Sequence, residues 1–178
     1  IYLGVTRALK IEKTSLIMDI GGGSVEFIIC NDEKILWKKS FEIGAWRLKN
    51  KFVKKDPITF SELAKLNEYF DQELLPLTNA IHQYQPELLI GVSGSFTTLN
   101  DIYHLFTNNK LPENNTTAFD YPISEFYRIY DNIVFQDREK RLEIPGMNTM
   151  RVDLINVSIP MILFIINKHK IDKIKISN

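Results

Sequence analysis

Short apolar runs separated by polar or glycine-containing segments predict five strands along the chain. The expected strands cover residues 15–19, 25–30, 35–41, 87–92 and 174–177. The first three follow one another through short turns, which predicts an antiparallel meander. The last strand alternates isoleucines with polar residues, so it is expected to be half-buried.

Apolar residues that recur three and four positions apart predict helices between these strands. The clearest helix covers residues 59–84, where Thr59 and Glu62 form a capping-box pattern and Pro76 is expected to kink or divide the helix. Further helical segments are expected at residues 1–9, directly after Gly44, and at 100–106, 124–135 and 151–170. Two stretches are expected to stay outside the core: a loop at 107–121 and a charged, solvated surface at 137–142.

The stretch at residues 16–26 is the centre of the pattern, because its two apolar runs are joined by glycines. A chain that folds back between Gly22 and Gly23 forms a hairpin, and counting outward from that turn places Asp19 opposite Glu26. A two-residue Gly-Gly turn suits the primed hairpin types, which need positive φ angles. The sequence therefore predicts both the register of this hairpin and its turn type.

This hairpin carries the residue types of a metal and phosphate site. Directly opposed side chains lie about 4.5–5.5 Å apart at Cβ, so Asp19 and Glu26 are expected to repel unless a cation or a shared proton lies between them. The turn residues without side chains let backbone N–H groups approach an anion closely; they are Gly21, Gly22 and Gly23. Ser24 adds a hydroxyl. The alternative is a purely structural hairpin, which would gain nothing from facing aspartate with glutamate.

A second glycine turn follows the strand at residues 87–92 and precedes a helix. Gly94 and Ser95 then lie at a helix N-terminus, where free N–H groups and the positive dipole end favour an anion. The alternative is a plain helix cap provided by Ser93 or Ser95. Arg47, near the start of the helix after Gly44, is expected either to help bind phosphate or to be solvated.

Composition narrows the function classes. The chain has 178 residues, enough for one domain or slightly more, and 22 basic residues balance 22 acidic ones. Zero net charge argues against a general nucleic-acid binder. The single cysteine, Cys30, allows no disulfide within the chain and fits a reducing cytoplasm. The sequence shows no signal peptide and no apolar run long enough to span a membrane, so we expect a cytoplasmic protein that binds neither membranes nor nucleic acids.

The order of elements is that of an α/β, ribonuclease-H-like domain, with a mixed five-stranded sheet flanked by helices. The residues from Asp19 to Glu26, read as DIGGGSVE, resemble the phosphate-binding signature of the Ppx/GppA phosphatase family, part of the actin-like ATPase superfamily. Residues 43–48 resemble its Gly-Ala-x-Arg-Leu element, and 91–95 its second glycine turn. The later Pro-Gly and Arg-x-Asp patterns match Pro145-Gly146 and 151–153, where Arg151 and Asp153 are expected to pair or to contact a partner domain.

The resemblance implies Mg²⁺-dependent hydrolysis of terminal phosphoanhydride bonds in inorganic polyphosphate or guanosine pentaphosphate. It implies that Asp19 holds Mg²⁺ directly or through water, and that Glu26 binds the metal or orients the attacking water. The residues expected to contact phosphate are Gly21, Gly22, Gly23, Ser24, Gly94, Ser95 and Arg47. Ser95 stands where the family more often has threonine, which keeps the hydroxyl.

The resemblance also implies that residues 1–178 are the second domain of a two-domain core. The family's catalytic-base glutamate and its first domain, with another phosphate loop, would precede residue 1. The chain is then expected to supply half of an interdomain site and to be catalytically silent alone, within a whole protein that can be a homodimer. Two alternatives stay open: an ATP-dependent member of the superfamily, such as a sugar kinase, and a non-catalytic regulator that binds polyphosphate or an alarmone.

Overall fold

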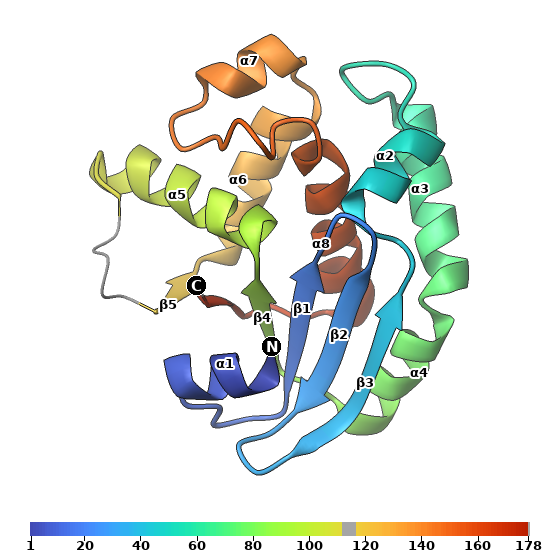
Figure 1. Ribbon diagram of the computed structural model, residues 1–178, viewed down its shortest axis with the longest axis vertical. Coiled ribbons are helices and arrows are strands. Elements are labelled where there is room, and N and C mark those ends of the chain that lie inside the picture. Colours follow the sequence, from blue (N-terminus) through green and yellow to red (C-terminus); the bar gives the residue numbers. More distant parts are fainter. Residues whose placement is uncertain (112–116, 178) are drawn as a thin grey trace.

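A mixed six-stranded sheet forms the centre of the computed structural model, which describes residues 1–111 and 117–177 (Figure 1). The strand order is β3-β2-β1-β4-β6-β5. Strand β4 runs parallel to both β1 and β6, and the remaining pairs are antiparallel. The strands are β1 (Ser15–Ile20), β2 (Val25–Cys30), β3 (Ile35–Phe41), β4 (Leu88–Val92), β5 (Ala118–Tyr121) and β6 (Ile174–Ser177).

The sixth strand corrects the expectation of a five-stranded sheet. Strand β5 lies within residues 107–121, which were predicted to be a loop, and it pairs with β6 at the sheet edge. Its four residues, Ala-Phe-Asp-Tyr, are too short to show a strand period, so only the distant partner strand defines them. Residues 112–116 of the predicted loop lie outside the described residues.

The helices confirm most of the predicted pattern. They are α1 (Tyr2–Ala8), α2 (Ala45–Phe52), α3 (Phe60–Glu73), α4 (Leu75–Tyr84), α5 (Gly94–Asn108), α6 (Ile123–Val134), α7 (Arg138–Glu143) and α8 (Ile155–His169). The capping box of Thr59 and Glu62 is present at the start of α3, and the long helix divides at Leu74, so that Pro76 lies in the first turn of α4. None of the helices among the described residues is long and apolar enough to cross a membrane.

The two faces of the sheet are covered unequally. The larger core joins one face to helices α3, α4, α5, α6 and α8, whereas α1 packs on the other face through a small cluster around Val5, Ile17 and Ile28. In Figure 1, α1 lies beside the lower ends of β1 and β4, and α8 lies behind the sheet. Because side chains alternate along a strand, Asp19 shares the face of Ile17, and Glu26 shares that of Ile28. Both carboxylates therefore lie on the thinly covered α1 side.

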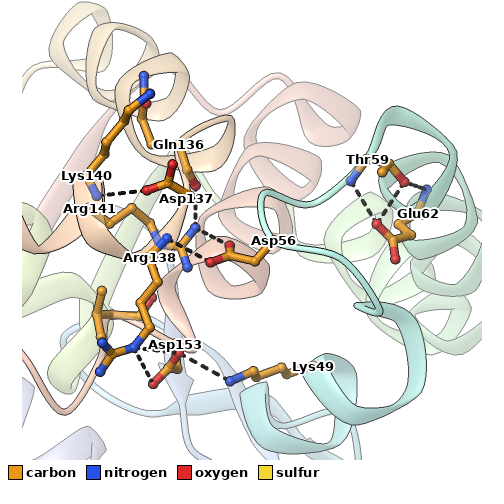
Figure 2. A network of polar contacts seen from close by, with 11 residues as sticks. Lys49, Asp56, Thr59, Glu62, Gln136, Asp137, Arg138, Lys140, Arg141 and Asp153 are labelled. Carbon is orange, nitrogen blue, oxygen red and sulfur yellow. Dashed lines mark hydrogen bonds and ion pairs between the residues drawn. The ribbon is translucent and has the colours of Figure 1, made fainter.

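A buried arginine joins the segments at one end of the sheet (Figure 2). Arg141 of α7 is 1% exposed, so the expectation that residues 137–142 form a solvated surface is wrong at this position. Its guanidinium donates to Asp56 at 2.8 Å, to the carbonyl of Val152 at 3.1 Å and to the carbonyl of Gln136. These partners satisfy the charge that burial would otherwise penalise.

The same network continues to helix α2. The carboxylate of Asp153 lies 3.4 Å from Lys49 of α2 and 3.3 Å from Arg138 of α7. Figure 2 shows both contacts. Together the two cations lower the pKa of Asp153 against the opposing effect of its partial burial, which is the largest single influence on it. Helices α2 and α7 are thereby tied to the turn that precedes α8.

Candidate functional site

The hairpin at the carboxyl end of β1 has the predicted register. Asp19 pairs with Glu26, Ile20 pairs with Val25, and the Gly21 N–H donates to the Ser24 carbonyl at 2.9 Å. The predicted turn type is wrong, because neither central glycine has a φ angle in the left-handed region that primed turns require.

Helix α2 explains the different turn. The carbonyl groups of the glycine turn accept hydrogen bonds from the N–H groups of the N-cap and first residues of α2: Gly44 to Gly23 (3.1 Å), Ala45 to Gly21 (2.9 Å) and Trp46 to Gly22 (3.0 Å). The turn thus satisfies donors that a helix start leaves unpaired. This contact needs the glycine at position 44, where a Cβ would lie 2.4 Å from the backbone of Gly22.

The turn also has N–H groups that take no part in those hydrogen bonds. Within residues 1–111 and 117–177, the N–H groups of Gly22, Gly23 and Ser24 donate to no protein acceptor. Gly23 is also open in front, since a Cβ built on it would meet nothing within 4 Å. Unpaired N–H groups on an accessible turn are suited to bind an anion such as phosphate.

The two predicted carboxylates differ in their surroundings. One oxygen of Glu26, Oε1, accepts hydrogen bonds from the hydroxyls of Ser24 at 2.5 Å and Ser40 at 2.8 Å. Asp19 has no hydrogen-bond or ion-pair partner among the described side chains. No protein cation in the described part of the chain neutralises either group, so the opposed pair has the electrostatic character of a cation site.

This donor set fits Mg²⁺ in one particular way. The described residues contain no group of three or more His, Cys, Asp or Glu side chains that could hold a metal. Mg²⁺, however, commonly uses one or two carboxylates and completes its shell with water and substrate phosphates. Asp19 and Glu26 fit that mode and not a cage built entirely of protein ligands.

The second glycine turn lies beside the first. The Ser93 hydroxyl donates to the carbonyl of Ile20, at the end of β1, at 3.1 Å. At the start of α5, the N–H groups of Gly94 and Ser95 have no acceptor in the described part of the chain. The Ser95 side chain is fully buried and its Oγ has no partner, so only its backbone N–H is placed to meet an anion.

A cavity of about 270 Å³ connects Asp19 with this second turn. It lies against α1, with Ser93, Gly94 and Thr97 on one side and Gly4 of α1 on the other. Strands β1, β4 and β6 run parallel, so their carboxyl ends meet at this edge. The fold therefore brings Asp19 and both glycine turns to one side of the sheet.

Arg151 lies beside the second glycine turn and does not form the expected pair with Asp153. Its guanidinium lies over Gly94, where a Cβ would be 2.4 Å from Arg151 Nε. The pairing of Arg151 with Asp153 is not formed, since Asp153 contacts Lys49 and Arg138 instead. The Arg151 side chain has no acceptor among the described residues, which leaves a cation beside the second turn.

Arg47 supports the first turn. Its Nε donates to the carbonyl of Gly23 at 2.8 Å, and its Nη2 contacts Glu42 at 2.6 Å. Both side chains are exposed, so solvent weakens their ion pair. Contact between Arg47 and phosphate stays a prediction.

Comparisons with known proteins identify relatives of this chain. A model of the Ppx/GppA phosphatase family matches residues 1–178. Exopolyphosphatase 2 of Mycobacterium tuberculosis (strain CDC 1551 / Oshkosh) is 22% identical over 140 residues, which are 79% of this chain and 43% of that protein. A crystal structure of an exopolyphosphatase from Cytophaga hutchinsonii ATCC 33406 is 38% identical with a TM-score of 0.95, covering 100% of this chain and 57% of that one.

A more distant solved structure shows the shared fold alone. The Aquifex aeolicus PPX-GPPA enzyme is 23% identical, with a TM-score of 0.84 over 99% of this chain and 57% of that one. The expected α/β fold class, a mixed sheet flanked by helices, is confirmed. The chain spans about half the length of the relatives it matches.

Proposed function

Because this chain belongs to the Ppx/GppA phosphatase family, we propose that it supplies part of an active site that hydrolyses the terminal phosphoanhydride bond of inorganic polyphosphate. The observation that carries the proposal is the pair of Asp19 and Glu26, without a protein cation, beside two turns with unpaired N–H groups. The solved relative that is 38% identical is named an exopolyphosphatase, which supports polyphosphate as the substrate. Guanosine pentaphosphate ends in the same type of bond and is the second candidate.

In this proposal the backbone binds the phosphates. The N–H groups of Gly22, Gly23 and Ser24 face one side of the terminal phosphoryl group, and those of Gly94 and Ser95 contact the chain of phosphates from the second turn. Preorganised donors of this kind stabilise charge on phosphoryl oxygens without reorganising during the reaction. Arg151, beside Gly94, adds a positive charge in the same region.

The carboxylates prepare the nucleophile. Asp19 and Glu26 would hold Mg²⁺, which when bound neutralises phosphate charge. Glu26 accepts a hydrogen bond from the attacking water and orients it toward the terminal phosphorus. The water oxygen forms the new P–O bond, the bridging P–O bond breaks, and its electrons leave with the shortened polyphosphate. The water's proton passes to a base that we assign to another part of the protein.

The proposed active site is therefore incomplete within these 178 residues. The chain covers 57% of the solved exopolyphosphatase, and we assign the complementary phosphate loop and the base to the remaining part of the protein. The isolated chain is then expected to release no phosphate. A cytoplasmic location and a homodimer remain predictions.

Phosphate release by the full-length protein tests this function. We expect release from long-chain polyphosphate or guanosine pentaphosphate with Mg²⁺, and a loss of about 100-fold or more in both Asp19→Ala and Glu26→Ala. Glu33→Ala, in the β2–β3 turn at the opposite end of the hairpin, is the control and should behave as wild type.

Three outcomes would contradict the proposal. Activity that persists in both carboxylate variants would exclude the assigned site. Polyphosphate binding without phosphate release would indicate the non-catalytic regulator. Phosphoryl transfer from ATP to an acceptor would indicate the ATP-dependent class.

A further inference from the structure

We propose that Ser40 is a positioning residue that, together with Ser24, fixes the Glu26 carboxylate for its task in the site. This inference rests on the proposed function, because it assigns a partner to a carboxylate used there. Neither the glycine-rich signature nor the carboxylate pair indicates Ser40, which lies outside both on strand β3.

The sheet register brings Ser40 to Glu26. Ser40 pairs with Glu26 across β3 and β2, and Glu26 pairs with Asp19 across β2 and β1. Directly paired residues on adjacent strands share one face of a sheet. Ser40, Glu26 and Asp19 therefore form one row across three strands on the α1 side.

Both serines act on the same oxygen. Ser24 Oγ lies 2.5 Å from Glu26 Oε1, and Ser40 Oγ lies 2.8 Å from it. An ionised carboxylate only accepts hydrogen bonds, so both hydroxyls donate. The donors come from the glycine turn and from β3, and two donors from different segments restrict the rotation of the glutamate more than either does alone. Oε2 has no partner among the described residues and is left to a metal or a water.

The chemical nature of the donors favours a functional role. A lysine or arginine partner would also orient Glu26, but it would cancel the negative charge that a cation site needs. Lys38 and Lys39 lie on the same strand, yet neither forms an ion pair with Glu26 in the described structure. Hydroxyl groups orient the carboxylate and leave its charge intact. They also oppose the repulsion from Asp19 that would turn Glu26 toward solvent.

The test compares two isosteric variants of the full-length protein, Ser40→Thr and Ser40→Val. Both are β-branched and suit an exposed strand position, and only threonine retains the hydroxyl. We measure Mg²⁺ binding directly by titration calorimetry without substrate, then kcat and KM for polyphosphate, with the thermal midpoint as a check on folding. Ser61→Ala removes an exposed hydroxyl at the start of α3 and is the control.

We expect Ser40→Val to weaken Mg²⁺ binding and to lower kcat by about 10-fold, with KM and the thermal midpoint unchanged, because partners behind a metal ligand typically contribute on the order of 10–100-fold. Ser40→Thr should keep wild-type values. If both variants match wild type, or both fall equally, Ser40 does not position Glu26. Glu26→Ala separates a failure of the role given to Ser40 from a failure of the proposed function. If the Glu26→Ala variant stays active, the proposed function itself is wrong.

Discussion

Ser93 has a backbone conformation that is normally reserved for glycine. Its φ is 74° and its ψ is 177°, and its hydroxyl donates to the Ile20 carbonyl at 3.1 Å. Residues held in this region cost about 1–3 kcal/mol and tend to occur at functional sites. This hydrogen bond joins the two glycine turns. The residue with the strained backbone is therefore also the one that holds the turns together.

We predict an unusual order of stability at this position. Ser93→Gly relieves the strain and loses the hydrogen bond, whereas Ser93→Ala loses the bond and keeps the strain. Glycine also lowers the free energy of unfolding by about 0.4–1 kcal/mol, because it gives the unfolded chain more conformational freedom. The glycine variant should therefore be more stable than the alanine variant by about 1–2 kcal/mol, measured as the free energy of unfolding in urea. Equal stabilities would show that residue 93 is not held in this conformation.

At the scale of residues, the sequence predicted the features that depend only on neighbouring positions in the chain. The pairing of Asp19 with Glu26 follows from a two-residue turn and the alternation of a strand, and it is confirmed. The turn type was wrong because α2 supplies donors to the carbonyls of Gly21, Gly22 and Gly23, a contact that no local pattern contains. The burial of Ser95 was missed for the same reason, since strand and helix packing decide it.

At the scale of elements, the missed features are those defined by distant partners. Strand β5 exists through its pairing with β6, and Arg141 is buried because Asp56 and two carbonyl groups accept from it. Its segment, Arg-Glu-Lys-Arg-Leu-Glu, has the composition of an exposed helix. By contrast, the division of the long helix near Pro76 was predictable, because proline acts on its own backbone.

The buried arginine gives a prediction for these elements. Arg141→Ala leaves Asp56 and two carbonyl groups without their donor, and removing one partner of a buried pair costs about 3–5 kcal/mol. Since Asp56 is 38% exposed at its side chain, we expect about 3 kcal/mol of lost unfolding free energy. Arg141→Lys should recover little of the lost free energy of unfolding, because one ammonium group cannot replace the planar guanidinium with its several donors.

Arg138→Ala is the matched control for this experiment. The Arg138 side chain is 49% exposed where it pairs with Asp153, so its removal should cost about 1 kcal/mol or less. Urea unfolding of the three variants provides the comparison. A lysine variant as stable as wild type would mean that the three contacts of Arg141 contribute little.

At the scale of the whole molecule, the unequal covering of the sheet decides where chemistry is accessible. The larger core lies behind the sheet, while among the described residues α1 and the segment that follows it cover the face that carries Asp19 and Glu26. Both glycine turns end at the same edge of that face. The fold class could be predicted from the order of elements, whereas the convergence of the two turns was expected only from the family resemblance. That the rest of the protein closes the site stays a proposal.

Stability of the whole molecule should depend on the protonation of His169, at the carboxyl end of α8. Burial, assisted by Lys168 and His82, lowers the pKa of His169 to about 4, and its buried Nε2 has no partner. The helix dipole favours a protonated histidine there by only about 0.3–1 kcal/mol, so burial prevails. In the unfolded chain the pKa is about 6.5. Below that pH the unfolded state binds a proton that the folded state refuses, and stability falls until the pH reaches about 4.

We therefore expect His169→Gln to resist acid better than wild type. Between pH 7 and about pH 4.5, the free energy of unfolding of wild type should drop by about 2 kcal/mol more than that of the variant, less than the full pKa difference allows because the side chain is only partly buried. Urea unfolding at the two pH values measures the difference, and the carboxylates common to both proteins cancel in it. His82→Gln, which removes the smallest of the three influences on His169, should behave nearly as wild type. Parallel losses in wild type and His169→Gln would mean that His169 accepts its proton in the folded state without cost.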